Sequence, residues 1–245
     1  MSGHSKWSTI KRSKGAADSK RAVIFGKLSK KITIDAREGN SGDLALNFKL
    51  RVEIDKAKAA SLPNDNIDRA IKRGLGIGGG PAIEEVIYEG YGPFGVAMII
   101  QTATDNTNRT VQSIKHILSK NGGSLGTKGS TIWQFETVGQ IMVEGAVNGK
   151  HSAQDIDQFE LLAIEHNAKD IEESEHGLII TTDPANLDEV TESLKSIGAT
   201  IASSEVVSRS TNLTSLNDQQ EEKINQLVEQ LENDEDVVAV YTSMN

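Results

Sequence analysis

The chain has 245 residues and a formal net charge of −9, with 37% hydrophobic but only 4% aromatic residues. This composition suits two or three small domains whose cores are built from aliphatic side chains. The absence of cysteine excludes disulfides and thiolate metal sites. No apolar run approaches the roughly 20 residues that span a bilayer, so we expect a soluble, cytoplasmic protein without membrane contact.

The charge is divided sharply along the chain. Residues 1–80 hold 17 basic and 8 acidic side chains, whereas residues 81–245 hold 9 basic and 27 acidic ones. The net charges are therefore +9 and −18. Such asymmetry indicates one part that contacts a polyanion and another that is repelled by it.

The first 31 residues carry nine of the basic side chains and a single acid, Asp18. Residues 1–15 are poor in large apolar side chains, and we expect a loose arm that orders on its partner. Trp7 lies among the basic residues, where it could stack on a base or sugar. The residues that we predict to contact nucleic acid here are His4, Lys6, Trp7, Lys11, Arg12, Lys14, Lys20, Arg21, Lys27, Lys30 and Lys31.

Three helices are expected in the basic part, at about 19–37, 43–60 and 63–74. The second is ambiguous, because apolar residues alternate from Leu44 to Ile54 as in a strand. Asp43 is a good N-cap and residues 55–60 favour helix, so we predict a helix. Five glycines and a proline between Gly74 and Pro81 are typical of a domain linker.

Strands and helices alternate after the linker. Strands are expected near 85–91, 96–104, 131–136, 140–143, 169–172, 177–182, 200–207 and 237–242. Helices are expected from Asn106 or Thr107, and at about 153–167, 186–197 and 219–233, with Asn106 as a cap. The order from residue 138 to 208 is β-α-β-β-α-β, the split βαβ or ferredoxin-like arrangement.

These elements predict three domains. A basic helical domain with a flexible N-terminal arm occupies residues 1–80. A discontinuous α/β domain comprises residues 81–136 plus 210–245, and a second α/β domain, residues 137–209, is inserted into it.

The sequence contains segments that partly match enzyme motifs, but none of them is complete. The segment from Gly122 to Thr131 is rich in glycine but lacks the Gly-Lys-Ser/Thr order of a P-loop and follows a helix instead of opening one. None of the five histidines has a partner at metal-ligand spacing. We therefore expect no catalytic residues, no metal and no cofactor.

Several long motifs resemble those of one family. Gly3-His4-Ser5-Lys6-Trp7 is similar to the opening signature of the YebC family, whose bacterial members are called probable transcriptional regulatory proteins. Further matching blocks are residues 63–71, 88–93, 104–110 and 122–133. The chain departs from the family pattern at Ala22-Val23, where Gly-Lys is usual, and at Phe94, where a glycine is usual.

The resemblance implies an α+β fold: an N-terminal three-helix domain followed by two α/β ferredoxin-like domains, one inserted in the other. It also implies helix for residues 44–54. It implies a non-enzymatic regulator of gene expression that binds promoter DNA, and we expect this protein to be a monomer. The alternative is a translation factor that acts on the ribosome through ribosomal RNA and tRNA contacts, as in mitochondrial relatives. Arg109 has two interpretations, part of a capped helix start or a nucleic-acid contact, and the second is kept among the predicted site residues.

Overall fold

The computed structural model describes residues 18–77, 79–145, 152–174 and 177–244. Two compact units can be distinguished among them. The larger unit contains residues 18–132 and 217–240, and the inserted unit contains residues 133–216 and 241–244. No helix in the described part of the chain is long and apolar enough to cross a membrane.

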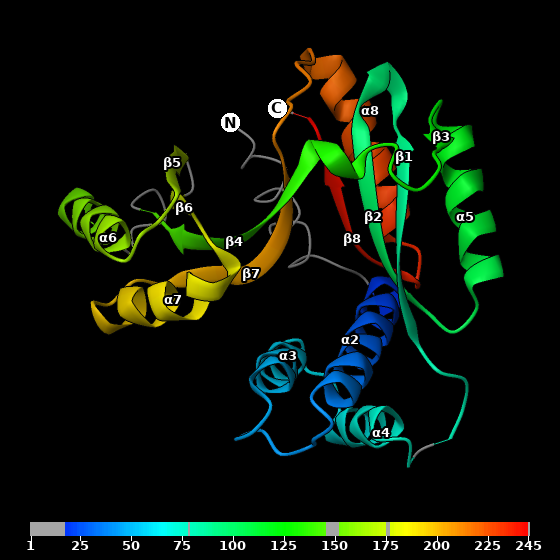
Figure 1. The fold of residues 1–245 in the computed structure, drawn as a ribbon, viewed down its shortest axis with the longest axis horizontal. Coiled ribbons are helices and arrows are strands. Elements are labelled where there is room, and N and C mark those ends of the chain that lie inside the picture. The colour runs from blue at the N-terminus through cyan, green and yellow to red at the C-terminus, as the bar shows by residue number, and fades with distance from the viewer. Residues whose placement is uncertain (1–17, 78, 146–151, 175–176, 245) are drawn as a thin grey trace. The chain divides into compact units, whose positions relative to one another are not determined.

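The larger unit begins with three helices (Figure 1). They are α2 (Asp18–Glu38), α3 (Phe48–Ala59) and α4 (Asn64–Gly74). Their core is aliphatic, as the composition predicts, and consists of Ile32, Ala36, Leu50, Ile54, Ala57, Leu62, Ile67 and Ala70. The predicted helix after Asp43 is confirmed, but it begins at Phe48 and not at Asp43.

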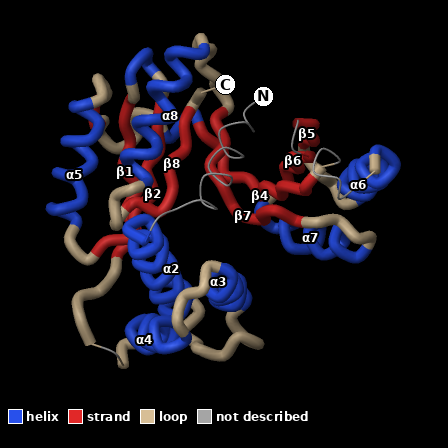
Figure 2. Tube along the Cα trace, turned by 180° about the vertical axis from the view of Figure 1, so that it is seen from behind, coloured by secondary structure: helices blue, strands red, loops and turns tan. Residues whose placement is uncertain are grey.

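A four-stranded sheet completes the larger unit, in the order β3-β1-β2-β8. The strands are β1 (Glu84–Tyr91), β2 (Ala97–Thr104), β3 (Ser124–Leu125) and β8 (Val237–Thr242). Helices α5 (Thr107–Lys120) and α8 (Asp218–Glu232) flank it (Figures 1 and 2). Strand β3, which pairs with β1, is too short to be recognised from sequence.

The inserted unit has a second four-stranded sheet, in the order β5-β6-β4-β7, with every pair antiparallel. The strands are β4 (Phe135–Glu144), β5 (Asp170–Ser174), β6 (Gly177–Thr182) and β7 (Ile201–Ser210). Helices α6 (Ala153–Glu165) and α7 (Leu187–Ser196) complete the β-α-β-β-α-β order. The predicted ferredoxin-like arrangement is confirmed for this unit.

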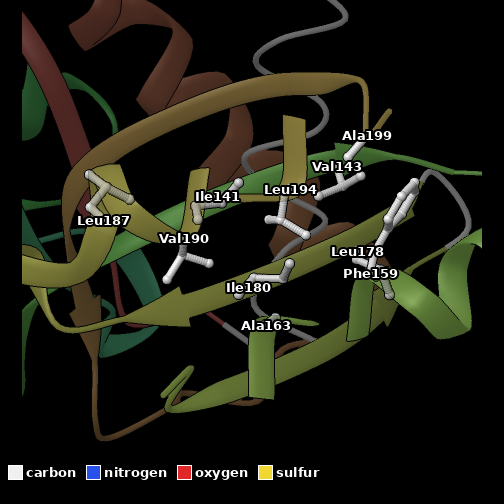
Figure 3. Close-up of a cluster of buried hydrophobic side chains, with 10 residues drawn as sticks. All are labelled: Ile141, Val143, Phe159, Ala163, Leu178, Ile180, Leu187, Val190, Leu194 and Ala199. Carbon is white, nitrogen blue, oxygen red and sulfur yellow. The ribbon is translucent and has the colours of Figure 1, made fainter. Parts of the chain in front are cut away.

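Helices α6 and α7 lie on one face of this sheet, where the apolar core is formed (Figure 3). Phe159 and Ala163 come from α6, and Val190 and Leu194 come from α7. They meet alternate residues of the strands, because successive side chains of a strand point to opposite faces. The strand residues of this core are Ile141, Val143, Leu178 and Ile180.

One strand prediction was wrong. Residues 131–136 and 140–143 are not two strands, because a short 3₁₀ turn, Ile132–Gln134, is followed by the single strand β4. The gap between the two predicted strands, residues 137–139, lies within this single strand. A Cβ at Gly139 would lie 2.4 Å from Thr182 Oγ1 and 3.1 Å from Leu187 Cβ. The absence of a side chain at Gly139 thus allows β4 to lie close to Leu187 of α7 and Thr182 of β6.

Candidate nucleic-acid interface

The predicted interface is only partly within the described residues. His4, Lys6, Trp7, Lys11, Arg12 and Lys14 lie outside them. Lys20 and Arg21 belong to the first turns of α2, and Arg21 is exposed. The contacts of the remaining predicted residues, Lys27, Lys30, Lys31 and Arg109, can be followed in the structure.

Lys27, Lys30 and Lys31 bind acceptors inside the larger unit. The ammonium group of Lys27 donates to the carbonyl oxygen of Glu232, and burial lowers its pKa. Lys30 Nζ lies 2.5 Å from Asp236 Oδ1 and donates to the Glu235 carbonyl at 2.9 Å. These bonds tie α2 to the connection between α8 and β8.

Lys31 makes a separate set of contacts on the same helix. Its Nζ lies 3.2 Å from Asp35 Oδ1, one helical turn along, and 3.5 Å from Glu85 Oε1 at the start of β1. The charge of Lys31 therefore also links α2 to the sheet of the larger unit.

Arg109 binds the same buried carboxylate as Lys30. Its guanidinium donates to Asp236 at 2.9 Å and to Asp105 at 3.2 Å. Thr110 Oγ1 donates to Asp236 at 2.8 Å. The capping interpretation of this segment is confirmed, because Asn106 Oδ1 accepts the backbone N–H of Arg109 at 3.1 Å.

Asp236 is the centre of this network and is only 2% exposed. Burial raises the pKa of its carboxyl, but the hydrogen bonds from Lys30, Arg109 and Thr110 outweigh burial and hold the pKa below its ordinary value. Sequence reasoning identified both basic partners and missed the carboxylate. It lies more than 100 residues from either of them, so no local pattern could reveal the pairing.

The glycine-rich segment that resembles a P-loop holds an anion from the protein itself. The carboxylate of Glu89, on β1, accepts the backbone N–H groups of Gly129, Thr131 and Ile132 at 2.6, 2.7 and 2.8 Å. Burial raises the pKa of Glu89, but these three amides lower it below its usual range. The backbone amides that could have cradled a phosphate are occupied by Glu89.

Metal ligands do not gather in the described part of the chain: no group of three or more His, Asp or Glu side chains there could hold a metal ion. Exposed basic side chains that the sequence analysis did not single out lie on α3 and α4. They are Lys49, Arg51, Lys56, Lys58, Arg69 and Lys72. Their only sequence signal is a basic residue outside the apolar stripe of a helix, which is common on solvated surfaces.

Together, the fold and the charges define an α+β protein with a basic helical N-terminal region and, later in the chain, an acidic ferredoxin-like unit. Family models agree along nearly the whole length: residues 5–77 match the TACO1/YebC protein N-terminal domain, and residues 83–244 match the TACO1/YebC second and third domain. The chain belongs to the TACO1/YebC family.

Individual relatives cover the chain almost completely. A probable transcriptional regulatory protein from Thermoanaerobacter pseudethanolicus is 46% identical over 98% of this chain and 96% of its own length. One from Chloroflexus aggregans is 44% identical over 100% of this chain and 96% of its own. The crystal structure of a conserved hypothetical protein from Aquifex aeolicus is similar, with a TM-score of 0.82 and 35% identity, covering 93% of this chain and 91% of the other.

Proposed function

We propose that this protein is a cytoplasmic, nucleic-acid-binding regulator of gene expression that acts on DNA as a transcription factor. The observation that carries the proposal is the charge division: residues 1–31 hold nine basic side chains and one acid in a chain of net charge −9. Many lysine and arginine contacts that release counterions are the general basis of affinity for nucleic acid. The names of the bacterial relatives support transcription as the process.

The proposed contact surface is the N-terminal arm continued by Lys20 and Arg21 at the start of α2. Trp7 would stack on an unpaired base or a sugar, and the basic residues would contact phosphates. Lys27, Lys30, Lys31 and Arg109 have carboxylate or carbonyl partners in the folded chain. They would have to exchange these partners to contact phosphate, so we propose that they mainly hold α2 in position.

The proposal is tested by comparing two variants that each remove three positive charges. The arm variant is Lys6→Ala, Lys11→Ala and Arg12→Ala, and the control is Lys115→Ala, Lys120→Ala and Lys195→Ala. Binding to a 30-base-pair promoter DNA is measured by fluorescence anisotropy across a range of salt concentrations. We expect the arm variant to bind more weakly and to reduce the slope of log K against log salt by roughly 2 to 3, because each phosphate contact contributes about 0.7 to 0.9.

The same two variants are cosedimented with ribosomes. Loss of ribosome association in the arm variant, without any DNA binding by the wild type, would replace transcription by the translation alternative. Equal binding of both variants to both targets would show that the arm is not the contact surface.

A further inference from the structure

Helix α6 of the inserted unit buries one face in the core and carries large apolar side chains on the opposite face. Phe159 and Ala163 belong to the core and are 2% and 0% exposed (Figure 3). Leu161 and Ile164 are 62% and 61% exposed. A surface helix normally presents polar side chains to solvent. Among the α-helix residues whose exposure is described, no other large apolar side chain is exposed.

The exposed pair lies in a well-formed helix. A capping box closes the first turn of α6: Ser152 Oγ accepts the N–H of Asp155 at 3.2 Å, and the Asp155 carboxylate accepts the N–H of Ser152 at 2.7 Å. Leu161 and Ile164 are three residues apart, so their side chains are neighbours on the helix surface. Single exposed apolar residues are common on proteins, but adjacent ones on a regular helix indicate a contact site.

The spacing around this pair is that of one heptad of a coiled coil. With Leu161 at position a, Ile164 takes position d. Glu160 then takes position g, immediately before the pair, and Glu165 takes position e, immediately after it. In coiled coils the a and d side chains pack between the helices, and the e and g charges select the partner. We call these four residues the α6 seam.

The carboxylates of the α6 seam are not neutralised by the protein itself. Glu160 and Glu165 have no ion-pair or hydrogen-bond partner among the described residues, and neither have the nearby acids Asp157 and Glu173. Burial, together with the charges of Glu173 and Asp157, raises the pKa of Glu160. The exposed apolar pair is therefore bordered by negative charge that a cationic partner would compensate.

We propose that the α6 seam docks a helix of a partner protein that has apolar residues at its a and d positions and lysine or arginine at e and g. Leu161 and Ile164 would supply the apolar contact, and Glu160 and Glu165 would select the basic partner. The seam is one heptad long, so the interface is small and the complex transient. We expect a dissociation constant on the order of 10–100 μM. This proposal goes beyond nucleic-acid binding and does not rest on it.

Other occupants fit the α6 seam less well. A second copy of the seam would place glutamates opposite glutamates, and like charges at e and g oppose pairing. Nucleic acid and anionic lipid would be repelled by the same carboxylates. No other described helix of this chain combines an exposed pair of large apolar residues with basic neighbours. The observations therefore favour a helix of a different, basic protein.

Two synthetic helices of about three heptads serve as probes of this surface. Both have leucine at every a and d position. One has lysine at every e and g position and the other has glutamate, so that like charges keep each probe monomeric. Each probe carries a fluorescent dye, and its anisotropy is measured during titration with the full-length protein. We expect saturable binding of the lysine helix and at least tenfold weaker binding of the glutamate helix.

A first pair of variants tests the apolar part of the α6 seam. Leu161→Ser with Ile164→Ser removes both apolar side chains, and Ile197→Ser with Val206→Ser is the control in the same unit. Ile197 and Val206 are 43% and 48% exposed. We expect the first variant to bind the lysine helix more than tenfold more weakly, because it loses the apolar contact area, and the control to stay within twofold of the wild type. Circular dichroism verifies that both variants are folded.

A second pair of variants separates selection by charge from general attraction to an acidic protein. Glu160→Gln with Glu165→Gln neutralises the α6 seam, and Glu221→Gln with Glu222→Gln removes the same amount of charge from α8. We expect the first variant to weaken binding of the lysine helix by roughly threefold to tenfold, as the loss of two exposed ion pairs predicts. The second variant should change the affinity by less than twofold.

Several outcomes would overturn this proposal. They are equal effects of the two charge variants, wild-type affinity in the Leu161→Ser and Ile164→Ser variant, and equal binding of the two probes. A dimer in sedimentation equilibrium that this variant dissociates would assign the α6 seam to a second copy instead.

The two proposals for this protein fail separately. The Leu161→Ser and Ile164→Ser variant should bind promoter DNA like the wild type, because the α6 seam lies outside the proposed nucleic-acid contact surface. Binding of the lysine helix by a protein that does not bind nucleic acid would refute the proposed function and leave the α6 seam as a docking site. Binding of DNA without selective binding of the lysine helix would do the reverse.

Discussion

Asp236 is the residue on which three segments of the larger unit converge. Its buried carboxylate receives hydrogen bonds from Lys30 of α2 and from Arg109 and Thr110 of α5. A buried carboxylate is tolerated only when charge and hydrogen bonds compensate its desolvation. Asp236 therefore decides how firmly the basic helix is held to the sheet.

We expect Asp236→Asn to lower the free energy of unfolding by about 2–4 kcal/mol, because it leaves Lys30 without its carboxylate. Glu235→Gln is the matched control: Glu235 is exposed and lies 3.9 Å from Arg109, so its loss should cost at most about 1 kcal/mol. Urea unfolding of both variants measures the difference. Similar costs for the two would contradict the assigned role of Asp236.

The contribution of Asp236 to the free energy of unfolding should be lost at acidic pH. The pKa of Asp236 is lowered in the folded protein, so its stabilisation is complete above its unfolded pKa and is lost as the pH falls through the folded value. The free energy of unfolding should decrease in that acidic range less steeply for Asp236→Asn than for the wild type. Parallel curves would show that Asp236 does not contribute.

Glu89 provides a second residue-scale prediction. Glu89→Gln replaces a carboxylate that accepts three backbone N–H groups with a neutral amide, which weakens these bonds. We expect a loss of about 1–3 kcal/mol and faster hydrogen exchange at Gly129, Thr131 and Ile132. Glu85→Gln on the same strand is the control. Unchanged exchange at the three amides would refute the anchoring role of Glu89.

At the scale of elements, the start of α3 illustrates how tertiary contacts choose between local signals. Asp43 has the chemistry of an N-cap, but the capping bond is made by Asn47 Oδ1, which accepts the N–H of Leu50 at 3.1 Å. The amide of Asn47 also donates to the carbonyl of Asp35 at 2.8 Å. Asn47 thus caps α3 and also donates a hydrogen bond to a carbonyl in the last turn of α2. The side chain of Asp43 makes neither contact.

We therefore expect Asn47→Ala to cost about 1–2 kcal/mol, since it removes a cap and one of two hydrogen bonds to the Asp35 carbonyl, which also accepts the N–H of Gly39. Asp43→Ala should cost less than about 1 kcal/mol, because the exposed Asp43 carboxylate accepts only the N–H of Ala45 among the contacts found. Thermal unfolding compares the two. A larger loss of stability in Asp43→Ala than in Asn47→Ala would instead support Asp43 as the N-cap, as the sequence predicts.

At the scale of the whole molecule, the proposed insertion of residues 137–209 makes a deletion feasible. Glu136 on β4 is directly opposite Arg209 on β7. Residues opposite one another in antiparallel strands have Cα atoms about 5 Å apart, a distance that a two-residue hairpin turn closes. The two ends of the insertion thus lie side by side.

We expect a chain in which Asn-Gly replaces residues 137–208 to keep the larger unit folded. Its far-ultraviolet circular dichroism should retain the helices of the larger unit, and unfolding should remain cooperative. A matched chain in which Asn-Gly replaces residues 107–120 removes α5 from the core and should not fold. Failure of the first deletion to fold would contradict the proposed domain division.

The sequence by itself determined the elements with strong local periodicity and the division of charge. Short stretches of sequence are enough to predict the helices around Val190 and Ile224, the β-α-β-β-α-β order and the basic N-terminal region. The tertiary structure alone decided the helix start at Asn47, the continuity of β4 through Gly139 and the carboxylate partners of Lys30 and Arg109. These depend on groups brought together from up to about 200 residues apart, and such contacts leave no periodic signal in the sequence.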